Sequence, residues 1–375
     1  MTNLEAEDDE VLAGAGADLM QRKKTGKIIR KAHARVGLLG NPSDGYYGKT
    51  ISFSLKNFAA TVTLTPSETL RIVPHPEHDP SEFPSLRDLV GWTGTAGYYG
   101  GVRLLLAACK RFHDYCAEHS IDIPDDSNFT LSYDTDIPRQ AGLSGSSAIV
   151  CAALSCLFEH YAVNDKIPIA ERPSLALSVE EELGITAGLQ DRVIQVYGGL
   201  VYMDFDRDVM TRIGGGIYEP MDPGLLPPHM YVVYSHNPEE SGKVHSNLRR
   251  RWIAGETSVV DDLNQVASFA EQGRTALKNG DTQLLAALID RNFDYRRKLF
   301  GDAVLGCLNI KMVEVVRSVG AASKFTGSGG AVLAFCPEGS SQSAKLKEAC
   351  AKEGFECVPA IVAPSLVTAS LDGSE

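Results

Sequence analysis

Long apolar runs, paired-cysteine motifs and an excess of basic residues are all missing from this sequence of 375 residues. No stretch approaches the length of a bilayer-spanning helix, and the start, MTNLEAEDDE, is acidic, so we expect neither a membrane partner nor a targeting peptide. The eight cysteines form no C-x-x-C pair, which favours free thiols in a reducing compartment and predicts a cytoplasmic protein. The formal net charge of -12 argues against nucleic acid as a partner.

The size and composition are those of a globular enzyme with two cores. Hydrophobic residues make up 43% of the chain and charged residues 22%, which is enough apolar material for two domains. We expect a disordered tail over 1–30, an N-terminal domain over 31–215 and a C-terminal domain over 216–370, with a linker near GLLPPHMYVVYS.

Apolar periodicity divides the chain into a β-rich opening and a helix-rich second half. Short strands are expected in RVGLLG, TISFSL, AATVTL, NFTLSYD and GGLVYMDF, and later in MYVVYS, KFTGSGGAVLAFCP and FECVPAIV. Helices are expected over 100–119 and 146–160, in SLALSVEEELG, in three or four segments between 243 and 319, and over 341–353. This order predicts an α/β (α+β) fold with a mostly antiparallel sheet in the second half.

One segment, IPRQAGLSGSSAIVCAAL over 137–154, joins a turn rich in glycine and serine to an apolar helix. Glycines let a ligand approach the backbone, and the exposed N–H groups at a helix N-terminus attract anions, so this loop suits phosphate. The hydroxyls of Ser144, Ser146 and Ser147 add donors and a candidate Mg²⁺ ligand. From the residues alone, a capped helix after a flexible turn remains the alternative.

Other phosphate and nucleophile motifs are not fulfilled. GNPSDGYYGKT contains G-K-T, but Ser43 stands where a P-loop requires glycine. Ser144 is followed two residues later by Ser146, so the G-x-S-x-G elbow of hydrolases is absent too. The pair His75 and His78 lies among prolines and acids, which favours a solvated loop over a metal site.

Three motifs together resemble one enzyme family. PRQAGLSGSSA resembles the central motif P-x-x-x-G-L-G-S-S-A-A of the GHMP small-molecule kinases, with one additional residue, Ser144. ARVGLLGNPSDGYYG resembles the N-terminal substrate motif of that family, and KFTGSGGAVLAF resembles its C-terminal glycine motif. The resemblance implies a two-domain GHMP kinase fold, with a β-rich N-terminal α/β domain and a C-terminal α/β sandwich on an antiparallel sheet.

Within that family, LGNPSDGYYGKTIS, GYYGGVRLL, GLQDRVIQVYGGLVYMDF and SGKVHS resemble the plant glucuronokinases. The resemblance implies transfer of the γ-phosphate of ATP to the anomeric hydroxyl of D-glucuronate, with ATP and Mg²⁺ required. A sugar acid and a nucleotide are then the expected partners, and the oligomeric state stays open. The alternatives are a 1-kinase for galacturonate, galactose, arabinose or a heptose, a non-catalytic sugar sensor, and an ATP-dependent decarboxylase on the same fold, which the first motif disfavours.

The resemblance also implies catalytic roles for particular residues. Asp191, in the GLQD turn, matches the catalytic base, and Arg35 matches the cation beside it. Ser147 and Glu180 match the metal ligands, with Ser146 and Glu182 as alternatives.

Further residues are expected to bind the nucleotide and the sugar. Asn41 and Asp44 match sugar-hydroxyl ligands, and Gly327, Ser328 and Gly329 would form the floor of the site, with Lys324 or Ser328 near the phosphates. The loop residues expected to bind nucleotide are Pro138, Gly142, Leu143, Ser144, Gly145, Ser146, Ser147 and Ala148.

A uronic acid also needs a cation for its carboxylate. The candidates are Arg103, Arg139, Lys243 and His245, and the sequence does not choose among them.

Overall fold

A computed structural model describes residues 26–96, 98, 100–185, 187–235 and 245–367 of the chain. Most of the expected tail over 1–30 and the candidate Lys243 lie outside the described residues.

The N-terminal sheet is built around one long central strand, β2 (Lys49–Pro66). One edge of β2 pairs along its length with β1 (Ile28–Leu39), and the other edge pairs first with β5 and then with β4. These pairings are antiparallel, whereas the short edge strand β3 runs parallel to β4. The remaining strands of this sheet are β3 (Arg71–Ile72), β4 (Phe129–Thr135), β5 (Leu200–Asp204) and β6 (Ile217–Met221).

The expectation of two short strands at TISFSL and AATVTL is wrong, because β2 runs through both. The polar residues Lys56 and Asn57 suggested a break, but they lie at a bulge where the β1 register shifts between His33 and Ala34. A bulge bends a strand without ending its pairing.

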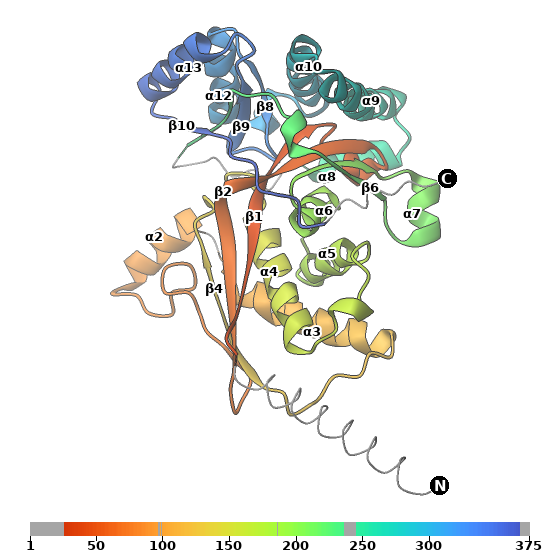
Figure 1. Ribbon diagram of the computed structural model, residues 1–375. Helices are drawn as coiled ribbons and strands as arrows, with labels where there is room; N and C mark the ends of the chain where they lie inside the picture. The colour runs from red at the N-terminus through yellow and green to blue at the C-terminus, as the bar shows by residue number, and fades with distance from the viewer. Residues whose placement is uncertain (1–25, 97, 99, 186, 236–244, 368–375) are drawn as a thin grey trace, which may run out of the picture.

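Helices of the first half gather on one side of β1 and β2, as Figure 1 shows for α3, α4, α5 and α6. The helix α4 packs directly on β1 and β2, and 11 of its 16 residues are buried, all of them apolar except Ser147. It is therefore a core helix, which its continuous apolar sequence requires. The helices of this half are α2 (Leu86–Ala96), α3 (Val102–Glu118), α4 (Gly145–His160), α5 (Arg172–Glu182), α6 (Gln190–Tyr197) and α7 (Arg207–Ile213).

The second half contains a four-stranded antiparallel sheet in the order β10-β7-β9-β8, as expected from the sequence. Its strands are β7 (Met230–Tyr234), β8 (Ala322–Phe325), β9 (Ala331–Phe335) and β10 (Glu356–Pro359). Its helices are α8 (His245–Ile253), α9 (Thr257–Asn279), α10 (Thr282–Phe300), α11 (Asp302–Leu305), α12 (Cys307–Ser318) and α13 (Ser340–Lys352). Figure 1 shows α9, α10, α12 and α13 at the opposite end of the molecule from α3 and α5.

The two halves share one hydrophobic core, which includes residues of β1, β2, α4, α9, α10 and β9. The strand β6 pairs with β5 of the first sheet, and the chain after β10 returns to that sheet through bridges at Val362 and Ser365. The domain limits 31–215 and 216–370 therefore stay a prediction, and the sheets themselves do not separate at residue 215.

The helix α10 has a special position, because it contacts both β8 of the second sheet and β1 of the first. Its buried face carries apolar residues at helical spacing, but it also carries Asn292 and Arg296, which are 1% and 2% exposed. Two polar side chains four residues apart lie on the same face of a helix. The fold therefore places an amide and a guanidinium between the two sheets.

Candidate active site

A buried ion pair between Arg35 of β1 and Asp191 of α6 lies at the centre of the site. Arg35 Nε donates to Asp191 Oδ1 at 2.6 Å, and Nη2 donates to Oδ2 at 2.9 Å, which is the two-point geometry of a guanidinium on a carboxylate. The Arg35 side chain is 5% exposed and that of Asp191 is 21% exposed. The carboxylate is therefore held in one orientation while part of it still faces solvent.

Arg35 also ties together the two glycine loops that the sequence singled out. Its Nη1 donates to the carbonyl of Gly142 at 2.6 Å and to that of Thr326 at 3.2 Å. A Cβ on Gly142 would lie 2.2 Å from the carbonyl oxygen of Gly329, and one on Gly327 would lie 2.3 Å from that of Gly142. The backbones of the two loops thus touch, and glycine is required because no side chain fits between them.

The additional residue of the central motif, Ser144, connects the first glycine loop to Asp191. It has a left-handed backbone, φ 65°, and its hydroxyl donates to Asp191 Oδ2. Its carbonyl accepts from Gln195 Nε2 at 2.9 Å. It directly precedes α4, whose first N–H groups receive no side-chain cap. The helix therefore begins with donors directed toward the Asp191 side of the loop.

Glu180 of α5 forms a second polar cluster with the two serines that open α4. Ser146 Oγ lies 2.8 Å from Glu180 Oε1, and Ser147 Oγ lies 3.3 Å from Oε2. Ser146 is exposed and Ser147 is buried, so both alternatives for a metal-binding serine lie at the carboxylate. Arg192 pairs with Glu180 Oε2.

Glu182, the alternative to Glu180, points elsewhere. It pairs with Lys110 of α3 at 3.2 Å. In the described part of the chain, no group of three or more His, Cys, Asp or Glu side chains could hold a metal ion.

The turn after β1 brings Asp44 to the same centre. Burial, together with the nearby Asp191 charge, raises the pKa of the Asp44 carboxyl from 3.8 to about 6, while the backbone N–H of Gln190 and the Arg35 and Arg192 charges oppose the shift. Gly188 closes against this carboxyl, since a Cβ there would lie 1.9 Å from Asp44 Oδ2. The expected sugar ligand Asp44 and the expected base Asp191 are thus neighbours.

Asn41 differs from Asp44, because it is buried and its side-chain oxygen accepts a hydrogen bond from Lys324. Lys324 Nζ donates to Asn41 Oδ1 at 2.6 Å, to Gly37 O at 2.6 Å and to Phe325 O at 2.8 Å. Lys324 is 2% exposed, and burial together with the Arg296 and Arg35 charges lowers its pKa well below the usual value. Lys324 therefore supports the turn from beneath.

Some of the remaining loop residues are part-exposed at the site, and others are buried in the hydrophobic core. Leu143 and Ala148 are buried in the core, whereas Pro138 is part-exposed. Ser328 is part-exposed, and its carbonyl faces Arg296 Nη2 at 3.5 Å. Gly329 lies against Asn309 of α12, whose amide oxygen accepts the Gly330 N–H at 2.7 Å.

Three polar side chains of the site were not expected from the sequence: Asn292, Arg296 and Asn309. Asn292 accepts the Gly40 N–H at 2.7 Å and donates to Asn41 O at 3.0 Å, so α10 holds the turn that carries Asp44. The signal in the sequence was present, because Asn292 and Arg296 interrupt the apolar face of a helix.

The residues expected to bind a uronate carboxylate stay predictions, and the side chains of two of them lie outside the described part of the chain. The charge of Arg139 acts on His78 and Tyr133, and Arg103 belongs to the first turn of α3, whose N-terminus Tyr133 and Asp79 contact. Lys243 lies outside the described residues, and the side chain of His245 is not described.

The chain matches the GHMP kinases N terminal domain over residues 103–199. It is 56% identical to "Glucuronokinase 1" of Arabidopsis thaliana over 346 residues, covering 92% of this chain and 95% of that protein. It is 55% identical to "Probable glucuronokinase 2" of the same plant, covering 93% and 95% of the two chains. The chain belongs to the GHMP kinase family.

Solved structures with low sequence identity share the fold. The Lactococcus lactis galactokinase in complex with galactose matches with a TM-score of 0.69 at 15% identity, over 94% of this chain and 99% of that one. The Lin0012 protein of Listeria innocua matches with a TM-score of 0.72 at 18% identity, over 92% and 100%. The GHMP kinase fold expected from the three motifs is confirmed.

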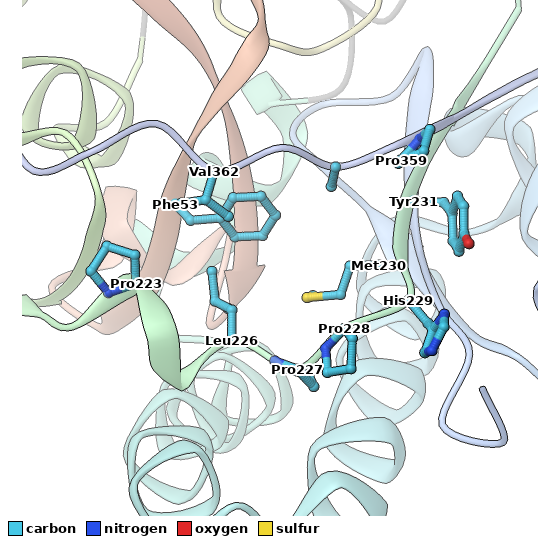
Figure 2. Close-up of a pocket in the computed structure, with 11 residues that line it drawn as sticks. Phe53, Pro223, Leu226, Pro227, Pro228, His229, Met230, Tyr231, Pro359 and Val362 are labelled. Atoms are coloured by element: carbon cyan, nitrogen blue, oxygen red, sulfur yellow. The ribbon is translucent and has the colours of Figure 1, made fainter. Parts of the chain in front are cut away.

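A separate cavity of about 200 Å³ lies away from this constellation. Figure 2 shows its wall of prolines from the segment before β7, with Phe53 of β2 and Val362 of the returning C-terminal segment opposite. None of the polar residues described above lines this cavity. Its lining contains His229 and Tyr231 but no carboxylate, arginine or lysine, so the polar cluster around Arg35 and Asp191 is the better candidate for the kinase site. No described helix is both long and apolar enough to cross a membrane.

Asp44→Asn should stabilise the protein at neutral pH while weakening its use of sugar. The pKa of Asp44 in the folded protein is raised to about 6. Between pH 4 and 6 the folded protein therefore keeps a proton on Asp44 that the unfolded chain releases. The free energy of unfolding falls as the pH rises through this window. The variant should exceed wild type by about 2 kcal/mol at pH 7.5 and by little at pH 4. Chemical denaturation at the two pH values measures the difference, and an equal difference at both would contradict the assigned cause.

Proposed function

We propose that this chain is an ATP-dependent glucuronokinase that phosphorylates the anomeric hydroxyl of D-glucuronate, giving glucuronate 1-phosphate and ADP. The identity of 56% with "Glucuronokinase 1" over nearly the whole of both chains carries the proposal. The grouping of Asp191, Arg35, Asp44 and the two glycine loops in one place supports it.

Asp191 is the proposed general base. The anomeric oxygen forms a bond to the γ-phosphorus, the bond from that phosphorus to the β–γ bridging oxygen breaks, and the sugar proton passes to the Asp191 carboxylate and then to solvent. Arg35 donates through Nε, Nη1 and Nη2 to protein acceptors. It therefore acts as a positioning residue, which orients Asp191 and places positive charge beside the reacting oxygen.

The loop from Gly142 to Ser147 is the proposed phosphate site. The N-terminus of α4 supplies uncapped N–H groups, and the tight contact with the Gly327–Gly330 loop keeps these groups in place. Binding phosphates to fixed backbone donors favours the charge that spreads over the transferred group.

Mg²⁺ suits the donors at Glu180. Serine hydroxyls and a carboxylate are hard oxygen ligands, and Mg²⁺ is commonly held by one or two carboxylates with phosphate oxygens and water completing its shell. Glu180 with Ser146 or Ser147 would hold the ion, which would neutralise charge on the nucleotide phosphates. Arg192, already paired with Glu180, keeps that carboxylate oriented.

We also propose that the protein works in a reducing compartment. All eight cysteines fall within the described residues and are free, which supports a reducing compartment such as the cytoplasm.

A substrate panel tests the proposed function. Purified protein is incubated with Mg-ATP and an equimolar mixture of glucuronate, galacturonate, galactose, arabinose and a heptose, and products are separated by mass and located by phosphorus-coupled NMR. Glucuronate phosphorylated at its anomeric carbon should dominate. Faster turnover of a neutral sugar would mean that the protein is a 1-kinase for that sugar instead. No turnover of any sugar would favour a non-catalytic sugar sensor.

Asp191→Asn should reduce kcat by about 100-fold or more, because the near-isosteric amide cannot accept the proton. Nucleotide affinity should change little. The matched control is Asp262→Asn, which removes a carboxylate paired with Lys298 at 2.7 Å outside the site and should keep wild-type turnover. Wild-type kcat in the Asp191 variant would disprove its role as base.

Glu180→Gln and Glu182→Gln form a matched pair for the metal site. The Glu180 variant should raise the Mg²⁺ concentration for half-maximal activity by about tenfold or more, whereas the Glu182 variant should match wild type. Because Glu180 is paired and fully buried, Ser146→Ala and Ser147→Ala provide milder variants. Identical Mg²⁺ activation curves for all four would overturn the assignment.

A further inference from the structure

Arg296 of α10 is a buried cation with no carboxylate partner in the described part of the chain. It is 2% exposed, and it forms no ion pair with any residue that the structure describes. Its Nε is buried without a hydrogen-bond partner in the same residues, and Nη2 reaches the Ser328 carbonyl only at 3.5 Å. Buried charges are ordinarily paired and hydrogen-bonded, so an unpaired guanidinium points to a ligand supplied from outside.

The surroundings of Arg296 fix its orientation without neutralising it. The rings of Phe300 and Phe325 lie 5.4 and 5.3 Å from the guanidinium carbon. Burial, together with the Arg35 charge, lowers the pKa of Arg296 to about 10, while Asp44 and Tyr46 oppose the shift. A guanidinium held between rings in a poorly solvated place binds an anion more strongly than one in water does.

Arg296 also lies next to the residues that would hold the sugar. It interacts electrostatically with Asp44, Arg35 and Tyr46, and its guanidinium faces the Ser328 carbonyl. Asp44, Tyr46 and Ser328 are each part-exposed, so the site opens to solvent on this side.

The chemistry of a uronate fits this arrangement. In a pyranose ring, the anomeric carbon and the carbon that bears the carboxylate both flank the ring oxygen. An anomeric hydroxyl at Asp191 therefore brings the carboxylate to a nearby edge of the ring. The cation that receives it must lie close to the Arg35–Asp191 pair, as Arg296 does.

We propose that Arg296 is the specificity-determining residue that binds the substrate's carboxylate and so selects a sugar acid over a neutral sugar. This inference rests on the proposed function, because it assumes that the acceptor is a uronate.

The experiment compares D-glucuronate with D-glucuronamide, its neutral near-isostere, in wild type, Arg296→Gln and Arg296→Met. The control is Arg291→Gln, because Arg291 also lies on α10 and stacks 4.7 Å from a phenylalanine ring, that of Phe269, but it is exposed. In the Arg296 variants, kcat/KM for glucuronate should fall by about 100-fold, mainly through KM, while that for glucuronamide should change less than about threefold. The Arg291 variant should keep the wild-type preference.

Three readouts separate this role from others. The KM for ATP should stay unchanged, since a rise in that KM with either sugar would mean that Arg296 binds a phosphate. The Tm should stay near that of wild type, because removing an unpaired buried charge leaves no partner exposed. An equal loss with both sugars together with a lowered Tm would mean a structural role and would overturn the proposal.

The experiment also distinguishes failure of the proposed function from failure of the role assigned to Arg296. If wild type does not phosphorylate glucuronate, the function itself is wrong. If wild type does so and the Arg296 variants keep its preference for glucuronate over glucuronamide, only the assignment of Arg296 is wrong.

Discussion

The contact between Arg35 and Asp191 organises the whole site. Through one guanidinium, β1 is joined to α6 by two hydrogen bonds to the carboxylate and to both glycine loops by bonds to the carbonyls of Gly142 and Thr326. A buried ion pair contributes little net stability by itself, because desolvation offsets the attraction. Its effect here is geometric, since it sets the position of the proposed phosphate loop relative to Asp191, the proposed base.

Three other charged side chains of the site lower the stability of the fold. Asp44 is half-buried beside another carboxylate, Arg296 is buried without an ion-pair partner among the described residues, and Lys324 is buried with its pKa lowered. Each would destabilise an ordinary core. Their presence in one small region, between the first turn, α10 and the C-terminal glycine loop, is the pattern expected where a polar substrate completes the charge balance.

Local features were predictable from the sequence, and long-range ones were not. The glycine loop, the start of α4 and the GLQD turn are contiguous segments, so their residue types reveal them. The antiparallel second sheet also followed from the order of its elements. In contrast, the bulge that keeps β2 continuous depends on its pairing with β1, and the polar residues at 56 and 57 misled the interpretation.

The contribution of α10 shows the same limit. Asn292 and Arg296 lie more than 100 residues after Asp191 in the sequence, and only packing of α10 against both β1 and β8 brings them to the site. The cations that the sequence suggested for the substrate carboxylate were chosen because they lie close to motifs along the chain. The structure brings an arginine from a distant part of the chain near Asp44 instead. The contact of Glu180, rather than Glu182, with the serines of α4 likewise depends on which face of α5 meets α4.

The most direct test of the account is a crystal structure of the protein with glucuronate and a non-hydrolysable ATP analogue. The account predicts the anomeric oxygen within about 3 Å of the Asp191 carboxylate and in line with the γ-phosphate, which lies at the Gly142–Ser147 loop. An anomeric oxygen distant from Asp191, or phosphates bound away from that loop, would contradict it.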